Sequence, residues 1–206
     1  MGDALGFDVH KLVLTRQTHT DTVLAVGEQE HGAGLFAPEL PECDGLITAT
    51  AGTALVVFTA DCTPVLLHDP VTGAVGAVHA GWRGTAADIA GKAVTAMCAH
   101  FGCKAENIRA AIGPNVAACC FETDRDVPEA MLAQYGKDAL DFIRPLKDKY
   151  FVDLKEINAL SLRRAGVEHI EIAPHCTVCD ADLFWSHRRT GNCRGSQGAI
   201  IVCNKE

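Results

Sequence analysis

The stretch CTPVLLHDPVTGAVGAVHAGWRGT, which runs from Cys62 to Thr85, predicts the β-hairpin around which the fold is organised. An apolar segment leads into the turn signal Asp69-Pro70-Val71-Thr72-Gly73, and residues 74–78 are apolar again. Hydrophobic runs on both sides of such a turn are typical of two paired, buried strands.

The register of this hairpin decides whether Cys62 and His79 meet. If residues 70–73 form the loop, Asp69 faces Ala74 and Cys62 faces Gly81. His79 is then the diagonal neighbour of Cys62 on the same face, at about 7–8 Å between backbones, a separation that two side chains can close onto one ion. A slip of one residue would send the two side chains to opposite faces.

Length and composition predict one cytosolic domain. The 206 residues are 48% hydrophobic and contain no linker, so we expect a single domain over residues 1–206. A net charge of −8 and a pI near 5.5 argue against a nucleic-acid partner, and any anionic ligand must be held by a few arginines. No apolar stretch is long enough for a bilayer and no signal pattern begins the chain, so we expect a cytoplasmic protein without a membrane partner.

The ten cysteines are expected to be reduced, because the chain is of middle size and has no secretion signal. A subset of them is expected to bind metal. Cys176 and Cys179 form a single Cys-x-x-Cys pair, and neither Cys193 nor Cys203 supplies the second pair that a zinc ribbon needs.

The periodicity also predicts two helices and several further strands. One helix is expected over residues 86–101, with Thr85 as its N-cap and Gly102 as its end, and a second from Leu154 to Ala165, with Asp153 as its cap. Strands are expected at residues 53–62, which end at Cys62, and at 74–78, 108–112, 170–173 and 199–203. Loops over 113–124, 174–180 and 184–196 are where we expect chemistry.

His19 is a third metal-ligand candidate, in a polar segment that follows the apolar residues 12–14. Two imidazoles and one thiolate give a tetrahedral zinc site with three protein ligands, which leaves the fourth position open, as in catalytic zinc centres. A blue-copper site would need an axial Met and a laccase-type cluster many more closely spaced imidazoles, and the sequence has neither near these motifs. Copper oxidase chemistry is therefore not favoured. Asp61, next to Cys62, is the nearest carboxylate that could move protons for a water molecule at this site.

Two loop motifs add polar side chains. The turn-forming residues 113–115 precede Cys119 and Cys120 and the carboxylate of Glu122, which they could direct into a cleft. The segment from Ser186 to Arg189 combines an imidazole with two guanidinium groups, which suits a phosphate or a carboxylate. A solvated charge pair is the alternative interpretation of that segment.

Together, these motifs closely resemble one family. They are Gln17-x-His19, Asp44-Gly45-Leu46-Ile47-Thr48, Thr59-Ala60-Asp61-Cys62-x-Pro64-Val65, His79-Ala80-Gly81-Trp82-Arg83-Gly84, Ile112-Gly113-Pro114, Cys120-Phe121-Glu122 and Ser186-His187-Arg188-Arg189. The resemblance is to the polyphenol oxidase or laccase-domain family, also called the YfiH-like or purine nucleoside phosphorylase family, and it runs from about Gly6 to the C-terminus.

The resemblance implies a zinc ion held by His19, Cys62 and His79, the same three residues reached above. It implies an α+β fold, a layered mixed β-sandwich flanked by helices (α/β/β/α), similar to cysteine-hydrolase-type folds. It also implies phosphorolysis of adenosine, inosine, guanosine or methylthioadenosine, and deamination of adenosine. On this basis the expected catalytic residues are Asp61, Cys62 and His79, and the expected substrate-binding residues are Arg83, Asp44, Cys120, Glu122, His187, Arg188 and Arg189.

One departure from the family concerns the N-terminus. Family members carry several dozen residues before the first matching helix, with an Arg-x-Gly-Gly segment that contributes to the site, and this sequence has no counterpart of them. We therefore expect an edge of the sheet to be exposed or covered by a partner chain, as in a homodimer.

Other functions remain open at this point. A metal-free hydrolase with Cys62 as nucleophile and His79 as base would act on peptides or cell-wall precursors. A copper polyphenol oxidase is the activity that the family's name suggests. A binding protein without catalysis would retain purine but not convert it.

Overall fold

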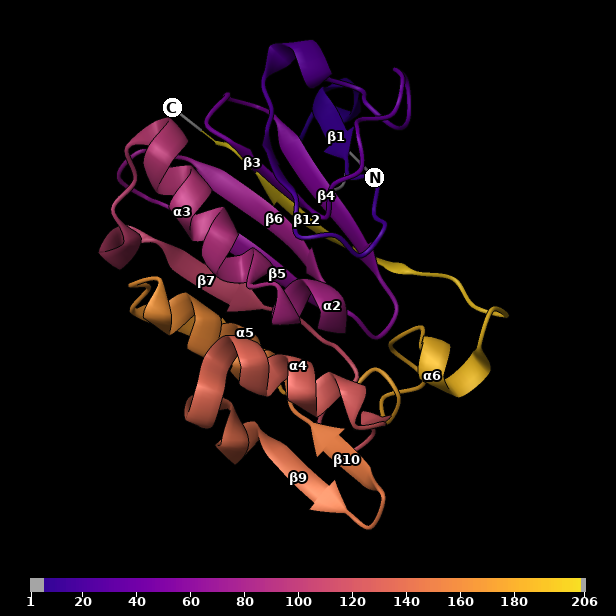
Figure 1. Ribbon diagram of the computed structural model, residues 1–206. Helices are drawn as coiled ribbons and strands as arrows, with labels where there is room; N and C mark the ends of the chain where they lie inside the picture. Colours follow the sequence, from indigo (N-terminus) through magenta and orange to yellow (C-terminus); the bar gives the residue numbers. More distant parts are fainter. Residues whose placement is uncertain (1–5, 205–206) are drawn as a thin grey trace.

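Mixed β-sheets and helices form the α+β fold seen in the computed structural model, which describes residues 6–204 (Figure 1). The largest sheet has the strand order β11-β7-β5-β6-β3-β2, in which parallel and antiparallel pairs are combined. Its strands are β2 (Val23–Ala25), β3 (Gly45–Thr48), β5 (Thr63–His68), β6 (Val75–Ala80), β7 (Arg109–Ile112) and β11 (His169–Ile172).

Two smaller sheets complete the β-structure. One has the order β1-β4-β12 and consists of β1 (Leu12–Leu14), β4 (Ala54–Thr59) and β12 (Gln197–Val202). The other, of order β8-β10-β9, consists of β8 (Glu122–Thr123), β9 (Ile143–Leu146) and β10 (Lys149–Val152).

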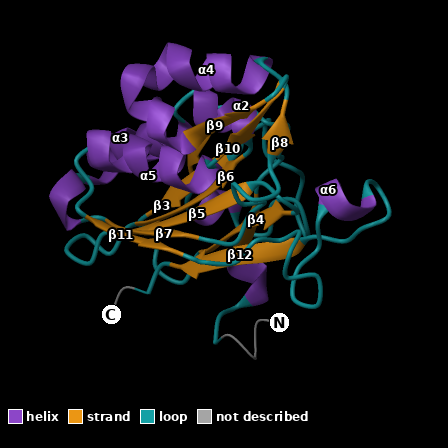
Figure 2. Cartoon of the chain, turned by 90° about the horizontal axis from the view of Figure 1, so that it is seen from below, coloured by secondary structure: helices purple, strands orange, loops and turns teal. Residues whose placement is uncertain are grey.

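Most of the helices gather on one face of the large sheet and the β1-β4-β12 sheet packs on the other, whereas the helix at residues 187–190 projects to one side (Figure 2). The α-helices are α2 (Trp82–Ala86), α3 (Ile89–Phe101), α4 (Asp126–Tyr135), α5 (Leu154–Arg164) and α6 (His187–Thr190). Short 3-10 turns are η1 (Val9–Lys11), η2 (Glu28–Glu30), η3 (Ala105–Asn107) and η4 (Gly136–Phe142). None of the helices among residues 6–204 is long and apolar enough to span a bilayer.

Alternating side chains of the sheets explain this layering. In β4, Leu55 and Val57 point toward the large sheet, where they pack with Leu46 of β3, whereas Ala54 and Val56 point outward. Phe7 and Leu12 pack on that outer face, where the resemblance implied a second helical layer. On the opposite side of the large sheet, the apolar face of α3 is fully buried, as its sequence predicted.

The predicted hairpin and its register are confirmed. Thr63 pairs with Ala80 and His68 with Val75, which continues to the pair of Asp69 and Ala74 across the turn. The strand predicted over residues 53–62 is wrong in its last three residues, because β4 ends at Thr59. Residues 60–62 turn the chain from the small sheet into the large one, with Asp61 at φ +90°.

Helix boundaries were predicted well at the C-terminal ends and less well at one N-terminus. Gly102 ends α3 in the left-handed conformation, and the side chain of Asp153 caps α5 by accepting from the N–H groups of Lys155 and Glu156. The helix predicted over residues 86–101 instead begins at Ile89 as α3, after a separate short helix, α2, that ends at Ala86. Asp88, rather than Thr85, precedes α3, and its left-handed backbone separates the two helices.

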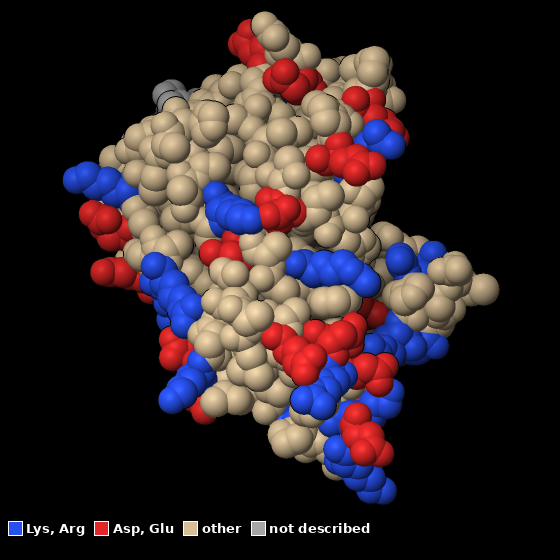
Figure 3. Space-filling model, in the orientation of Figure 1, with Lys and Arg blue, Asp and Glu red and all other residues tan. Residues whose placement is uncertain are grey.

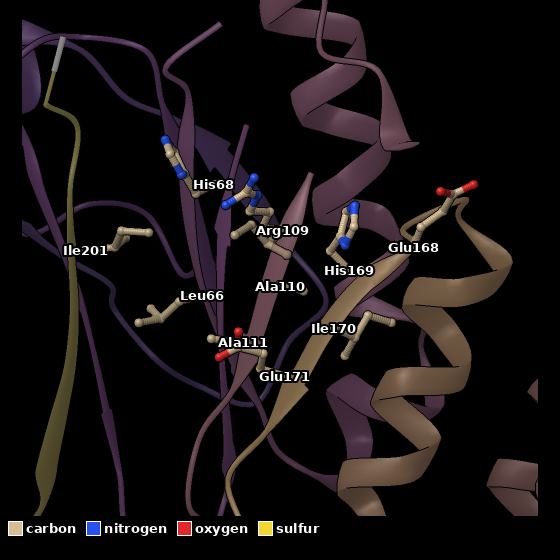
Figure 4. Close-up of a pocket in the computed structure, with 11 residues that line it drawn as sticks. Leu66, His68, Arg109, Ala110, Ala111, Glu168, His169, Ile170, Glu171 and Ile201 are labelled. Carbon is tan, nitrogen blue, oxygen red and sulfur yellow. The ribbon is translucent and has the colours of Figure 1, made fainter. Parts of the chain in front are cut away.

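Part of the large sheet is not covered by the small one. Figure 4 shows a groove between Ile201 of β12 and the strands β7 and β11, with Leu66, Ala111 and Glu171 beside it. The groove has a volume of about 670 Å³. The open region is therefore a face of the sheet next to its β11 edge. The expectation of a sheet edge that is exposed or covered by a partner chain stays a prediction.

The hairpin register depends on Asp69, which is fully buried and accepts from the N–H of Val71 at 2.8 Å and of Thr72 at 3.4 Å. We expect Asp69→Ala to lower the free energy of unfolding by about 2 kcal/mol in urea titrations, because two turn N–H groups lose their acceptor. Burial raises the pKa of Asp69, but the hydrogen bond from Val71 and its neighbours outweighs it and lowers the pKa below 3.8.

Stability from this carboxylate is therefore present above pH 3.8 and lost as the pH falls below that value. The variant should lack this portion of the acid-induced loss. Asp124→Ala is the control, since Asp124 is exposed and pairs with Lys149 at the surface. Equal unfolding free energies for Asp69→Ala and the unchanged chain would contradict the assignment.

Candidate metal centre

His19, Cys62 and His79 come together at one end of the two packed sheets. Their ligand atoms all lie within 4.8 Å of one another, and the sulfur of Cys62 is 3.8 Å from Nε2 of His19. The two imidazole rings meet edge to face, with centroids 5.0 Å apart. The three predicted ligands thus form one cluster, although they come from the loop after β1, the turn before β5 and the end of β6.

Gly81 makes room for this cluster. In the register of the hairpin it lies opposite Cys62, and a Cβ atom on it would lie 2.7 Å from Cδ2 of His19 and 3.4 Å from the sulfur of Cys62. Its backbone, at φ −68° and ψ 168°, is open to any residue. Space, rather than backbone conformation, requires glycine here.

Asp44 holds two of the three ligands in place. It is fully buried, and its Oδ1 accepts from Nδ1 of His79 at 2.6 Å. The same carboxylate accepts from the backbone N–H groups of Thr18, His19 and Thr20, which fixes a loop in which His19 has φ +64°. Because Asp44 engages Nδ1 of His79, Nε2 of that ring is left for a ligand.

The charges in this cluster support one another. Burial would raise the pKa of Asp44, but hydrogen bonds from His79 and Thr20 lower it to about 2. Burial likewise opposes charge on the other two groups, yet the pKa of Cys62 falls to about 6 beside the two imidazoles, and that of His79 rises to about 9 between Asp44 and Cys62. The site favours a thiolate, which is the form that binds metals.

A second buried carboxylate belongs to Asp61, the residue before Cys62. Its Oδ1 accepts from the hydroxyl of Thr177 at 2.6 Å and its Oδ2 from the backbone N–H of Arg188 at 2.6 Å. Asp61 therefore joins the turn before β5 to the loop of Thr177 and to α6, both of which are far away in the sequence. Its role as a proton carrier stays a prediction.

Two adjoining pockets open at the ligand cluster. One, of about 340 Å³, is lined by His19, Cys62 and His79 together with Gln17 and Phe58. The other, of about 240 Å³, is lined by His19, Asp61, Cys62, His187 and Arg188, and Arg194 lines both. The larger groove between β12 and β11 contains none of the three ligand candidates.

Three of the other predicted residues, Arg83, Glu122 and Arg189, do not line either pocket. Arg83 is exposed and stacks on Trp82, with its guanidinium carbon 4.2 Å from the ring centroid. Glu122 is exposed, and its carbonyl oxygen accepts from Arg188 at 2.7 Å. The side chain of Arg189 donates to the carbonyl groups of Thr177, Val178 and Phe184, so it holds the loop together.

Arg194 is the residue that sequence reasoning missed. It lines both pockets, and its Nε lies 3.4 Å from Nδ1 of His187. Lys and Arg side chains gather around the projecting segment that carries α6 (Figure 3), against the net negative charge of the chain. A basic residue in a loop rich in Gly, Asn and Cys gives little signal until its neighbours in space are known.

Residues 1–204 match the family described as "Multi-copper polyphenol oxidoreductase laccase". The chain is 35% identical to "Purine nucleoside phosphorylase YlmD" of Geobacillus stearothermophilus, over 98% of this chain and 74% of the relative. It is 36% identical to "Adenosine deaminase RL5" of an unknown prokaryotic organism, over 91% of this chain and 73% of the relative. The crystal structure of the hypothetical protein YfiH of Bacillus licheniformis superposes with a TM-score of 0.94 at 34% identity, covering 98% of this chain and 77% of that chain.

Substituting Asp44→Asn tests the buried carboxylate. Three backbone N–H groups and an imidazole would share a neutral amide, so we expect unfolding free energy to fall by about 3 kcal/mol. Zinc affinity, measured by competition with a chromophoric chelator, should fall about 10- to 100-fold. Asp21→Asn is the matched control, because Asp21 follows the same loop but pairs with Lys92 at the surface. An Asp44→Asn protein with unchanged stability and affinity would refute this role.

Gly81→Ala tests the space at the cluster separately from its charge. We expect zinc affinity to fall about tenfold or more because the methyl group displaces the ring of His19, while the metal-free protein changes stability by less than about 1 kcal/mol. Gly27→Ala serves as the control, since a Cβ there has only ordinary contacts, the nearest at 3.5 Å. Undiminished zinc affinity in Gly81→Ala would show that the ring does not need this space.

Proposed function

The chain belongs to the multi-copper polyphenol oxidoreductase laccase family, and we propose that it is a zinc-dependent purine nucleoside phosphorylase that also deaminates adenosine. The observation that carries the proposal is the open set of three donors at a pocket mouth. The names of the two relatives above, a purine nucleoside phosphorylase and an adenosine deaminase, supply the substrate class.

The donor set fits zinc. Bonds of about 2.0–2.3 Å to nitrogen and sulfur would place tetrahedral donors about 3.3–3.8 Å apart, and the three donors here lie within 4.8 Å before any ion draws them in. The lowered pKa of Cys62 favours the thiolate, and Asp44 fixes the tautomer of His79. When bound, zinc would act as a Lewis acid and bring the pKa of a water molecule toward 7.

The side chains around the donors fit a nucleoside and a phosphate. We assign the phosphate contact to Arg194, with His187 and Arg188, because these groups line the pocket next to Cys62. Arg189 has less to offer, since its guanidinium already holds three carbonyl groups. Arg83, Cys120 and Glu122 line neither pocket and stay weaker candidates for contact.

The burial of Asp44 favours a positioning role over contact with substrate. Asp61 is the carboxylate nearest to Cys62 in the sequence and lines the smaller pocket. We propose that it moves a proton for the attacking water in deamination, while Thr177 and the backbone of Arg188 hold its orientation.

Copper oxidase chemistry fits the site poorly. Met97 and Met131 are buried in apolar clusters and are not among the residues that line the site, while Met1 lies outside the described residues. Within residues 6–204, the histidine-containing metal-ligand cluster has two imidazoles, fewer than a multi-copper centre needs. Failure to oxidise a phenolic dye with added copper would dismiss this activity.

A second candidate function rests on Cys62, His79 and Asp44. The contacts from Asp44 to His79 and from His79 toward Cys62 give the order carboxylate, imidazole and thiol found in cysteine hydrolases. Such an enzyme would act on peptides or cell-wall precursors without metal. A chelator separates the two, because it should stop the zinc enzyme and leave the hydrolase working.

Incubation of the zinc-loaded protein with adenosine, with and without phosphate, tests the proposal. Adenine should appear only with phosphate, and inosine in both cases, as resolved by chromatography. His79→Ala and Cys62→Ala should each lose one equivalent of zinc and lower both activities by at least about 100-fold, beyond the effect of losing an outer partner.

His68→Ala is the matched control, since His68 is an exposed histidine at the other end of β5. It should retain both zinc and turnover. Full zinc retention in the His79 and Cys62 variants would sink the zinc proposal. Tight purine binding with no product in any condition would leave a binding protein in its place.

A further inference from the structure

Four cysteines outside the candidate metal centre converge from two loops. Cys119 and Cys120 lie between β7 and β8, and Cys176 and Cys179 lie after β11. Their sulfur atoms all lie within 4.8 Å of one another, and that of Cys179 is 3.7 Å from Cys119 and 3.5 Å from Cys120. A second pair of cysteines for Cys176 and Cys179, which is not evident from the sequence, is therefore present. It consists of two adjacent residues, Cys119 and Cys120, that are far away in the chain.

The sulfur spacing suits a metal ion. Four thiolates around tetrahedral zinc, with bonds of about 2.3 Å, lie about 3.8 Å apart. A disulfide needs about 2.05 Å, and each of these cysteines is free. The cluster could bind a metal, and its all-sulfur donor set excludes magnesium and calcium, which prefer oxygen.

The backbone holds the two loops together at this point. Asn115 pairs with Cys176 as an isolated parallel bridge, and the N–H of Thr177 donates to the carbonyl of Asn115 at 2.9 Å. The N–H of Ala117 donates to the sulfur of Cys176 at 3.4 Å. Burial would raise the pKa of Cys176, but this N–H and those of Cys179 and Val178 lower it, whereas burial and the neighbouring thiols raise the pKa of Cys119 and of Cys120, so a metal would have to displace their protons.

A buried lysine beside the cluster gives independent support. Lys155 is 5% exposed, and its ammonium donates to the carbonyl groups of Ala173 and His175, at 2.6 and 2.7 Å. Among residues 6–204 no carboxylate lies within 4.0 Å of this ammonium group, although a buried lysine is rarely left without a counter-charge. Burial lowers the pKa of Lys155, whereas negative charge on Asp153, Cys176 or Cys119 raises it.

We propose that Cys119, Cys120, Cys176 and Cys179 form a second, closed zinc site with a structural role. The four thiols release their protons when the metal binds, and four thiolates around Zn²⁺ then carry a net charge of −2, for which Lys155 supplies part of the compensating positive charge. Four protein ligands leave no position for substrate, so this site is distinct in kind from the open centre at His19, Cys62 and His79.

The site would hold one wall of the substrate pocket. Thr177, between two of the cysteines, donates to Asp61, and the carbonyl of Asp61 accepts from Val116 on the other cysteine loop at 3.0 Å. A metal that joins the two loops therefore keeps Asp61 in position from both sides. Without the metal, the hydrogen bonds between the loops and those to Asp61 would still join them, and Lys155 and Arg189 would still hold the later loop.

The zinc content of purified full-length chain, measured by elemental mass spectrometry, tests the proposal. We expect two zinc ions per chain, and one in each of two variants, Cys176→Ser with Cys179→Ser, and His79→Ala. Cys193→Ser, which changes an exposed cysteine outside both clusters, should retain two. Cys179→His should keep the second zinc, because imidazole replaces thiolate as a ligand.

Cobalt provides a readout that does not depend on folding of the cysteine double variant. The His79→Ala chain, refolded or exchanged with Co²⁺, should show the intense visible absorption of tetrahedral cobalt bound by several thiolates. A colourless complex, two zinc ions retained in the double variant, or a disulfide within the cluster of the protein isolated under reducing conditions would each overturn the proposal. Two zinc ions with no adenosine turnover would contradict the proposed function and leave this inference standing, whereas turnover with a single zinc would do the opposite.

Discussion

Asp44 places a negative charge where no solvent reaches, and the loop around residues 18–20 and the ring of His79 are arranged to satisfy it. An uncompensated carboxylate in this position would cost several kcal/mol, so the fold is committed to supplying those donors. The same hydrogen bonds orient His79 and hold His19 in a left-handed conformation that a non-glycine residue rarely adopts. The hydrogen bonds that compensate the buried charge of Asp44 are thus the same ones that position His19 and His79.

The parts of this molecule that could be predicted from the sequence depend on local chemistry. The turn of Asp69 to Gly73 fixed the hairpin register, and with it the meeting of Cys62 and His79, because the strand period of two leaves only two choices of face. Gly102 and Asp153 marked helix ends through a left-handed backbone and a side-chain cap. These signals need no knowledge of the rest of the chain.

The features that escaped prediction are those set by packing between distant segments. The apolar residues before Cys62 do not indicate that the chain leaves one sheet at Thr59 and enters another at Thr63. Because both strands are buried, their hydrophobic patterns look alike. The pairing of Cys120 with Cys179 spans 59 residues and depends on the parallel approach of two loops. Likewise, the burial of Asp44 and the position of Arg194 follow from tertiary contacts. From its sequence motif alone, Asp44 was expected to bind substrate.

Two of the three proposed ligands of the open centre lie on connections between the two layers of the sandwich. His19 lies in the loop from β1 of the small sheet to β2 of the large one, and Cys62 lies in the turn from β4 of the small sheet to β5 of the large one, while His79 is near the end of β6 in the large sheet. The spacing of these three residues therefore depends on the relative position of the sheets, and an ion bound as proposed would resist their sliding. Substitutions between the layers, at Leu46 or Leu55 for example, would then change the layer spacing and with it the metal affinity of the centre. Metal binding and core packing would be coupled, as two sites are in allostery.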